Sequence, residues 1–357
     1  MGHLTKRLKN ILGKDLIAVF SKITKIDEFK GWWKGASQLN PQALGRLKRS
    51  IVVTSTGAST RIEGSHLTDK EVEKLLKGTR VNKLTNRDAQ EVAGYAEVLK
   101  TVFDSYQDIP FTEGVILQFH SQLLKYSDKD KQRRGKYKAA PNKVVAFDHA
   151  GGEAVLFNPT DPHLTPFEMQ ELIEWTRAEL KNGEFHPIVI ISNFIVEFLA
   201  IHPFHDGNGR LSRILTNLLL AKAGYSYMPY ASLEKIIEDH KNEYYVGLRS
   251  VQKSGKSQRA EMARWIHFFV DVMIRQIDVL KEFLQSSSTD SLLSPNHQRT
   301  LTLYEQHEEI STKLVAEHLE IPSVTAKQIL NRLLELKLVK RLGAGRTTRY
   351  RLVTASG

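Results

Sequence analysis

Apolar residues recur at three- and four-residue spacing through the middle of the chain, which is the pattern of helices with one buried face. The spacing predicts helices at residues 86–106, 166–181, 188–201, 211–223 and 259–284. A polar, serine-rich stretch follows at residues 285–291 and predicts a linker. The pattern therefore indicates a mainly α protein.

Two shorter regions have the composition of β-hairpins. Residues 144–147 and 155–157 flank a polar turn at 148–152, and residues 338–342 and 347–353 flank a glycine-containing turn at 343–345. Helices are predicted before the second hairpin at residues 299–308, 311–319 and 323–337, the last capped by Ser323. This order is that of a small α+β winged-helix domain. We therefore expect an N-terminal helical region at 1–100, a core at 101–285 and a winged helix at 286–357.

The most specific segment of the chain joins the predicted helices at 188–201 and 211–223. It reads His202-Pro203-Phe204-His205-Asp206-Gly207-Asn208-Gly209-Arg210-Leu211-Ser212-Arg213. Gly207 and Gly209 can take positive φ and carry no Cβ, so their backbone N–H groups can close around phosphate oxygens at the start of the following helix. The segment therefore predicts an anion-binding turn between two buried helices.

The charged residues of this segment suit a nucleotide. Asp206 offers the hard oxygen that Mg²⁺ prefers, while Arg210 and Arg213 lie three apart on one helix turn and can reach phosphates. Asn208 can bond a phosphate or ribose oxygen. His202 is the base that titrates near neutral pH beside the bound phosphate.

Other readings of the same residues are less complete. Asp-Gly-Asn-Gly alone is a common turn, and a calcium loop would need further acidic ligands that do not follow. A zinc protease would need His-Glu-x-x-His, which is absent from the sequence. The adjacent pair His205-Asp206 is also compatible with a metal phosphohydrolase, although the sequence identifies no partner ligand.

The segment matches, residue for residue, the His-x-Phe-x-Asp/Glu-Gly-Asn-Gly-Arg-x-x-Arg signature, so the chain resembles the Fic family. The resemblance implies a helical core that transfers AMP from ATP to a protein hydroxyl with Mg²⁺, and Phe204 as a core anchor. It also implies a role for each residue of the motif: His202 as the base, Asp206 as the Mg²⁺ ligand, Gly207, Asn208, Gly209 and Arg210 on the α- and β-phosphates, and Arg213 on the γ-phosphate.

A second resemblance lies upstream, at Ser59-Thr60-Arg61-Ile62-Glu63-Gly64. It is similar to the Ser/Thr-x-x-x-Glu-Gly/Asn inhibitory motif of Fic proteins. The similarity implies an N-terminal inhibitory helix whose Glu63 pairs with Arg213 and blocks productive ATP. By itself such a segment is also typical of a helix cap or a surface turn.

Two further features carry both a functional and an ordinary interpretation. The hairpin at 144–157 resembles the Fic flap that holds a target segment by strand addition, or it is a surface hairpin. Tyr244 and Tyr245 lie where related proteins place an aromatic residue against adenine, or they belong to a buried helix face.

Composition limits the remaining choices. The 357 residues carry a net charge of +11 and no cysteine, which excludes disulfides, thiolate zinc sites and a cysteine nucleophile. No uninterrupted apolar run reaches the ~18 residues of a membrane span, and the first residues are charged. We therefore expect a cytoplasmic protein without membrane contact.

Two functions of different classes follow from these observations. The first and favoured one is an autoinhibited protein adenylyltransferase that uses ATP and Mg²⁺ on a Ser, Thr or Tyr of a target protein. The second is a DNA-binding regulator whose Fic core senses nucleotide or removes AMP, with DNA contacting residues 290–357. Polar and basic side chains would supply those contacts, namely Lys327, Gln328, Asn331 and Arg332 on a recognition helix and Arg341, Arg346, Arg349 and Arg351 on the wing. The sequence leaves the target and the oligomeric state open, with a homodimer as one option.

Overall fold

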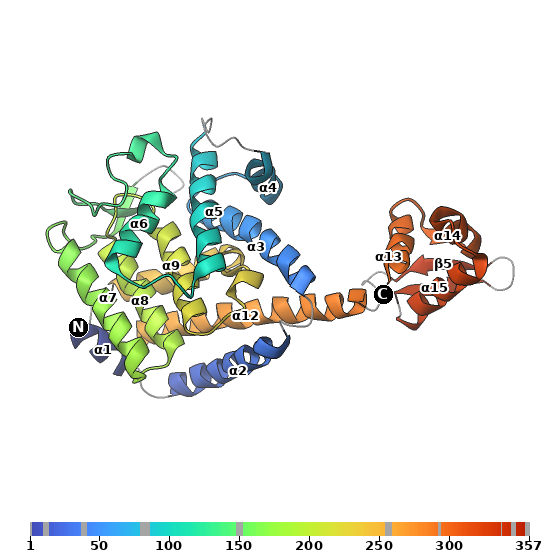
Figure 1. The fold of residues 1–357 in the computed structure, drawn as a ribbon. Coiled ribbons are helices and arrows are strands. Elements are labelled where there is room, and N and C mark those ends of the chain that lie inside the picture. The colour runs from blue at the N-terminus through green and yellow to red at the C-terminus, as the bar shows by residue number, and fades with distance from the viewer. Residues whose placement is uncertain are drawn as a thin grey trace. The chain divides into compact units, whose positions relative to one another are not determined.

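The computed structural model describes residues 2–9, 14–36, 41–78, 86–147, 153–253, 259–291, 294–336, 338–343 and 348–353. They form two compact units, Met1–Leu280 and Lys281–Gly357. The expectation of a mainly α protein is confirmed (Figure 1). No helix among these residues is long and apolar enough to cross a membrane.

The first unit consists of helices with one two-stranded sheet. Its helices are α1 (Gly2–Lys9), α2 (Lys14–Ala36), α3 (Pro41–Ile62), α4 (Asp69–Gly78), α5 (Arg87–Ser105), α6 (Glu113–Leu123), η2 (Asp128–Asp130), α7 (Thr165–Asn182), α8 (Pro187–Ile201), α9 (Asn208–Lys222), η3 (Met228–Tyr230), α10 (Leu233–Asp239), α11 (Lys241–Lys253) and α12 (Arg259–Ser291).

Helices α8 and α9 lie inside this unit, with α5, α6 and α7 on one side and α12 on the other (Figure 1). Every residue from Ile188 to Leu199 is buried, as is every residue from Arg210 to Ala221. A helix that has no polar face turned to solvent is stable only inside a core. The short connection between α8 and α9 is therefore anchored at both ends in the core.

The predicted helix boundaries hold to within a residue or two for α5, α7 and α8, but two predictions were wrong. Helix α9 begins at Asn208 rather than at residue 211, because Gly207 takes the left-handed conformation and caps the helix. Helix α12 runs through residues 285–291, which were expected to form a linker. Extending a helix whose earlier turns are already packed gains one hydrogen bond per residue, so a polar tail can continue it.

The predicted hairpin is present as β1 (Val144–Phe147) paired with β2 (Glu153–Phe157) in antiparallel register. The register shifts between Val144 and Val145, where Val144 faces Phe157 and Val145 faces Val155. The turn expected at 148–152 lies outside the described residues.

The second unit combines short helices with a three-stranded antiparallel sheet of order β3-β5-β4. Its elements are α13 (Pro295–Thr302), η5 (Leu303–Glu305), β3 (Glu309–Ile310), α14 (Thr312–Leu319), α15 (Ser323–Glu335), β4 (Val339–Leu342) and β5 (Arg349–Leu352). Ile310, Val315, Leu330 and Tyr350 belong to its own hydrophobic core.

Three details of this unit differ from the sequence-based prediction. The helix expected at 299–308 begins at Pro295 and ends at Thr302, followed by the short helix η5. Glu309 and Ile310 form a third strand, which was not predicted. Ser323 is the first residue of α15 rather than its cap, a position taken by Pro322. Arg346 and the middle of the predicted turn lie outside the described residues.

Candidate active site

The connection between α8 and α9 begins and ends with left-handed backbone. His202 ends α8 at φ 50°, and Gly207 precedes α9 at φ 81°. Glycine adopts this conformation at little cost, but a histidine pays a backbone strain of about 1 kcal/mol or more. A non-glycine residue is held in such a conformation only where surrounding contacts fix it, and these residues concentrate at functional sites.

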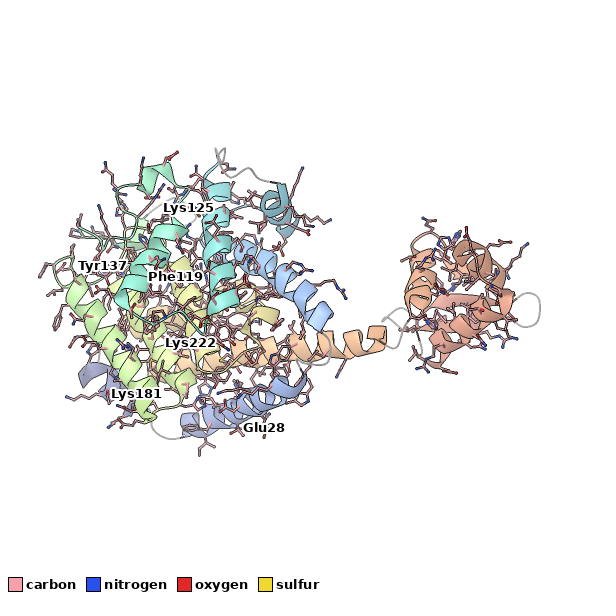
Figure 2. All side chains as sticks on the ribbon, in the orientation of Figure 1. Glu28, Phe119, Lys125, Tyr137, Lys181 and Lys222 are labelled. Carbon is pink, nitrogen blue, oxygen red and sulfur yellow. The ribbon has the colours of Figure 1, made fainter. Side chains whose placement is uncertain are left out.

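The loop is closed by the side chain of Asn208. Its Oδ1 accepts from the Phe204 N–H at 2.9 Å, and its Nδ2 donates to the Phe204 carbonyl at 2.8 Å. Phe204 is fully buried, as expected for an anchor, and packs on Tyr137, whose position beside α6 is labelled in Figure 2. The side-chain amide of Asn208 thus holds the loop, and its contact with a nucleotide stays a prediction.

His120 on α6 supports the same loop and was not foreseen from the sequence. Its ring stacks on Phe204 with centroids 3.8 Å apart. The Gly135 N–H donates to its Nδ1 at 3.0 Å, so the proton resides on Nε2, which donates to the Asp206 carbonyl at 3.1 Å. Burial lowers the pKa of His120 to about 4, and the ring is therefore neutral.

Lys138 and Asn142 hold the other side of the loop through its carbonyl groups. The Lys138 ammonium donates to the Ile201 carbonyl and to Asn142 Oδ1, both at 2.9 Å. Asn142 Nδ2 in turn donates to the Phe204 carbonyl at 3.1 Å. Burial lowers the pKa of Lys138 to about 8. No sequence motif marked these two residues, because their role depends on tertiary contacts.

His202 itself is partly buried. Burial, and next the nearby Lys138 ammonium, lower the pKa of His202 to about 4. The imidazole is therefore unprotonated at neutral pH. It can accept a proton from a hydroxyl without first losing one.

Asp206 belongs to a closed ring of four alternating charges. Its Oδ1 contacts Arg210 NH2 at 3.1 Å, and its Oδ2 lies 3.5 Å from Arg87 NH2 on α5. Glu91, one turn along α5, contacts Arg210 NH1 at 3.0 Å and Arg87 Nε at 2.8 Å. Burial alone would raise the pKa of Asp206, but Arg210, the Gly207 N–H and Arg87 together hold it below its usual value.

Arg213 is brought together with both ends of the upstream motif. Its NH2 donates to Glu63 Oε1 at 2.8 Å and to the Ser59 carbonyl at 2.9 Å, while its Nε donates to Ser59 Oγ at 2.8 Å. Burial opposes the charge on Arg213, but the Glu63 carboxylate and next the Tyr244 and Tyr95 side chains together outweigh it and raise the pKa of Arg213. Gly64, at φ 104°, turns the chain away directly after Glu63.

The Glu63 carboxylate also lies over the start of α9. A Cβ built on Gly209 would lie 2.2 Å from Glu63 Oε1, which is closer than real contacts allow. Gly209 does not have the positive φ that the sequence analysis allowed for it. A glycine is needed at this position because it has no Cβ, which lets the Glu63 carboxylate approach closely. The first hydrogen bond of this helix runs from the Leu211 N–H to the Gly207 carbonyl. Glu63 therefore occupies the end of a helix that favours anions.

The two tyrosines have different environments. Tyr244 is 3 % exposed and packs against Trp265, with ring centroids 5.8 Å apart. Tyr245 is half-buried, and its hydroxyl donates to the Ile62 carbonyl at 3.4 Å, next to Glu63. Of the two, Tyr245 is therefore the one placed beside the predicted nucleotide site.

Asp206 is the carboxylate of this loop that suits a divalent cation. Among the described residues there is no group of three or more His, Cys, Asp or Glu that could hold a metal by itself. A single carboxylate nevertheless fits Mg²⁺, which commonly takes one or two protein ligands and completes its coordination with phosphates and water.

Residues 110–220 match the model of the Fic/DOC family, so this part of the chain is a Fic domain. Curated relatives named protein adenylyltransferase Fic include those of Drosophila yakuba, 27% identical over 66% of this chain and 43% of theirs, and Drosophila willistoni, 29% identical over 51% and 34%. The chain therefore spans less than half the length of these relatives.

Solved structures show the same fold. A Fic family protein from Desulfovibrio desulfuricans G20 is similar over 97% of this chain and 98% of its own, with a TM-score of 0.62 and 25% identity. Fic-1 from C. elegans, residues 134 to 508, is similar over 76% and 74% of the two chains, with a TM-score of 0.59 and 19% identity.

Proposed function

We propose that this protein transfers AMP from ATP to a hydroxyl group of a protein. The single observation that carries the proposal is the position of His202, a neutral base at the edge of a loop that leads into a buried helix N-terminus with two arginines. An unprotonated imidazole beside an anion-binding helix end is suited to take the proton of a hydroxyl that attacks a phosphate. The names of the Drosophila relatives support the same reaction.

Different residues of the chain would perform different parts of the reaction. The first-turn amides of α9, with Arg210 and Arg213, hold the phosphates of ATP. His202 takes the proton of the attacking hydroxyl as its oxygen bonds to the α-phosphorus and the bond to pyrophosphate breaks. Asp206 would hold Mg²⁺, which neutralises charge on the phosphates. Tyr245, whose hydroxyl donates to the Ile62 carbonyl, would contact the adenine.

The target protein would be held by the hairpin β1–β2. An extended segment that adds to one strand gains backbone hydrogen bonds without requiring a particular sequence. This arrangement would bring a Ser, Thr or Tyr side chain to His202. Strand addition therefore accounts for how one loop serves different hydroxyl side chains.

Glu63 would keep the enzyme inactive at rest. Its carboxylate and the γ-phosphate are both anions that need the same guanidinium of Arg213. An intramolecular carboxylate has a high effective concentration, so ATP must displace it or bind in a poorer pose. The contact of Glu63 with Gly209 adds a steric component to this competition.

Incubation with labelled ATP and Mg²⁺, followed by mass spectrometry of the protein and of a lysate, tests the proposal. We expect a mass increase of one AMP on a hydroxyl residue, strongest in Glu63→Gly and absent in Glu63→Gly with His202→Ala. Absence of any AMP adduct in folded Glu63→Gly protein would contradict transferase activity. Release of AMP from a modified protein by the same chain would instead assign the reverse reaction.

A second function, DNA binding, is favoured by the surface of the second unit. The order of its helices and strands supports the predicted winged helix, and Lys327, Gln328 and Asn331 are exposed on α15. Lys340 and Arg349 are exposed on β4 and β5, whereas Arg332 and Arg351 are paired with Glu335 and Glu309.

Titration of the full chain with duplex DNA at increasing salt tests this function. Binding should weaken steeply with salt because counterions are released from the phosphates. Lys327→Glu with Lys340→Glu should abolish it. Absence of binding at low salt would favour a protein partner for this surface.

A further inference from the structure

The ring of charges around Asp206 contains one cation that the proposed reaction does not use. Arg87 lies at the start of α5, and its NH2 is 3.5 Å from Asp206 Oδ2. Asp206 Oδ1 is engaged by Arg210 and by the Gly207 N–H, at 3.1 and 2.6 Å. Oδ2 is therefore the oxygen of Asp206 that faces a replaceable partner.

We propose that Arg87 stands in for the divalent cation on Asp206. In the nucleotide-free protein its guanidinium neutralises the carboxylate, and it leaves when the metal and the nucleotide bind together. This inference rests on the proposed nucleotide site. It adds a residue on α5 that sets how strongly the metal and the nucleotide depend on each other.

The two arginines of the ring differ in how easily they can leave. The Arg210 side chain is 2% exposed, so moving it would leave a charge buried without its partners. The Arg87 side chain is 63% exposed, and its contact with Asp206 is the longest in the ring. Arg87 can therefore move into solvent at little cost, whereas Arg210 cannot.

Glu91 gives Arg87 a second position. Its Oε1 accepts from Arg87 Nε at 2.8 Å, an i to i+4 pair within α5, and its Oε2 contacts Arg210. Arg87 can give up Asp206 and keep this contact, so the exchange breaks one ion pair rather than two. The same pair holds the guanidinium within reach of Asp206 when the cation leaves.

The proposal predicts effects of opposite sign with and without the metal. Without the metal, Arg87 is a positive charge near the phosphates, and its removal should weaken nucleotide binding. With the metal, Arg87 competes for Asp206 Oδ2 and repels the incoming cation, so its removal should leave binding unchanged or strengthen it. A residue that only supported the fold would weaken both.

The experiment measures ADP affinity by calorimetry in EDTA and in MgCl₂, using the full chain with Glu63→Gly so that the site is open. Adding Arg87→Gln should weaken metal-free ADP binding by about two- to five-fold, as expected for loss of an exposed charge contact. Binding of ADP with Mg²⁺ should stay equal or tighten. Arg87→Lys should restore most of the metal-free affinity, because it keeps the charge.

Arg177→Gln is the matched control, since Arg177 is exposed on α7 and its removal changes net charge equally. It should leave both affinities as they were. Equal weakening by Arg87→Gln in both conditions, or no change in either, would overturn the proposed exchange. Failure of Glu63→Gly itself to bind ADP in either condition would overturn the nucleotide site and this inference with it.

Discussion

The carboxylate of Glu63 lies so close to Gly209 that no other residue could replace this glycine without displacing the carboxylate. A Cβ at Gly209 would lie 2.2 Å from Glu63 Oε1 and 2.9 Å from its Cδ, while Arg213 NH2 binds the same oxygen from another side at 2.8 Å. One carboxylate therefore covers both an arginine and a helix N-terminus of the Fic loop.

Removal of this carboxylate should activate the enzyme. Glu63→Gly should raise AMP transfer by about 5- to 150-fold, the usual range for a coupling between two sites. Transfer is measured as incorporation of labelled AMP into the chain and into lysate proteins. The same variant combined with His202→Ala should be inactive, which separates relief of inhibition from a new activity. If Glu63→Gly folds and binds ATP yet transfers no faster, the inhibitory role of Glu63 is wrong.

A methyl group at Gly209 should report how closely the phosphates approach α9. In the Glu63→Gly protein, Gly209→Ala should weaken ADP binding by about tenfold or more, because a phosphate would have to withdraw from the helix end. The substitution should not reduce stability, since Gly209 has helical backbone and alanine favours helices. Circular dichroism and calorimetry on the same samples distinguish the two effects. Unchanged ADP affinity would mean that the phosphates lie elsewhere.

The rate of transfer should be insensitive to pH around neutrality. The pKa of His202 is lowered to about 4, so the base is already unprotonated at pH 6 and above. In Glu63→Gly the carboxylate that raises the pKa of His202 is absent, so the acidic limb of the pH profile should not shift to higher pH. The measurement is kcat/KM against pH between 5 and 9. An acidic limb near pH 6.5 would indicate an exposed histidine and contradict the desolvated environment.

His120 should make the stability of the fold depend on pH. Its pKa is lowered to about 4 in the folded protein, against 6.5 for an ordinary histidine, so the unfolded chain binds the extra proton. Its contribution is complete above pH 6.5 and is lost as the pH falls towards 4, by up to about 3 kcal/mol.

A substitution isolates this contribution from that of other groups. His120→Asn should destabilise the protein by about 2–4 kcal/mol at pH 7, because it removes the stacking on Phe204 and one of two hydrogen bonds. The difference between the two proteins in urea unfolding should shrink at pH 4.5. A difference that stays constant with pH would show that His120 titrates normally.

The local features of the site could be predicted from the sequence, but most of the residues that hold its loop in place could not. The glycines, the arginines and the helices that flank them follow from spacing, because they lie within twelve residues of each other. His120 lies on α6, Glu91 on α5 and Lys138 in the segment before β1, and no periodicity links such positions. Glu63 and Arg213 are 150 residues apart and were paired only through the resemblance to the Fic family.

The two errors in helix boundaries had different physical origins. Residues 285–291 contain serines that favour loops locally, yet they extend α12. Helix propensity is a weak local preference, and a packed helix that precedes such residues can override it. The start of α9 was misplaced for the opposite reason, since Asn208 and Gly209 resemble turn residues but follow a glycine that has already made the turn.

Burial of α8 and α9 on all sides has a consequence for how the protein loses activity. The amide hydrogens of these helices should exchange with solvent only when the whole first unit opens, because no smaller motion exposes them. The loop between the helices should therefore open only when the helices themselves unfold. Warming short of global unfolding should leave this loop intact and act first on the partly exposed side chains beside it, Glu63 and Arg87.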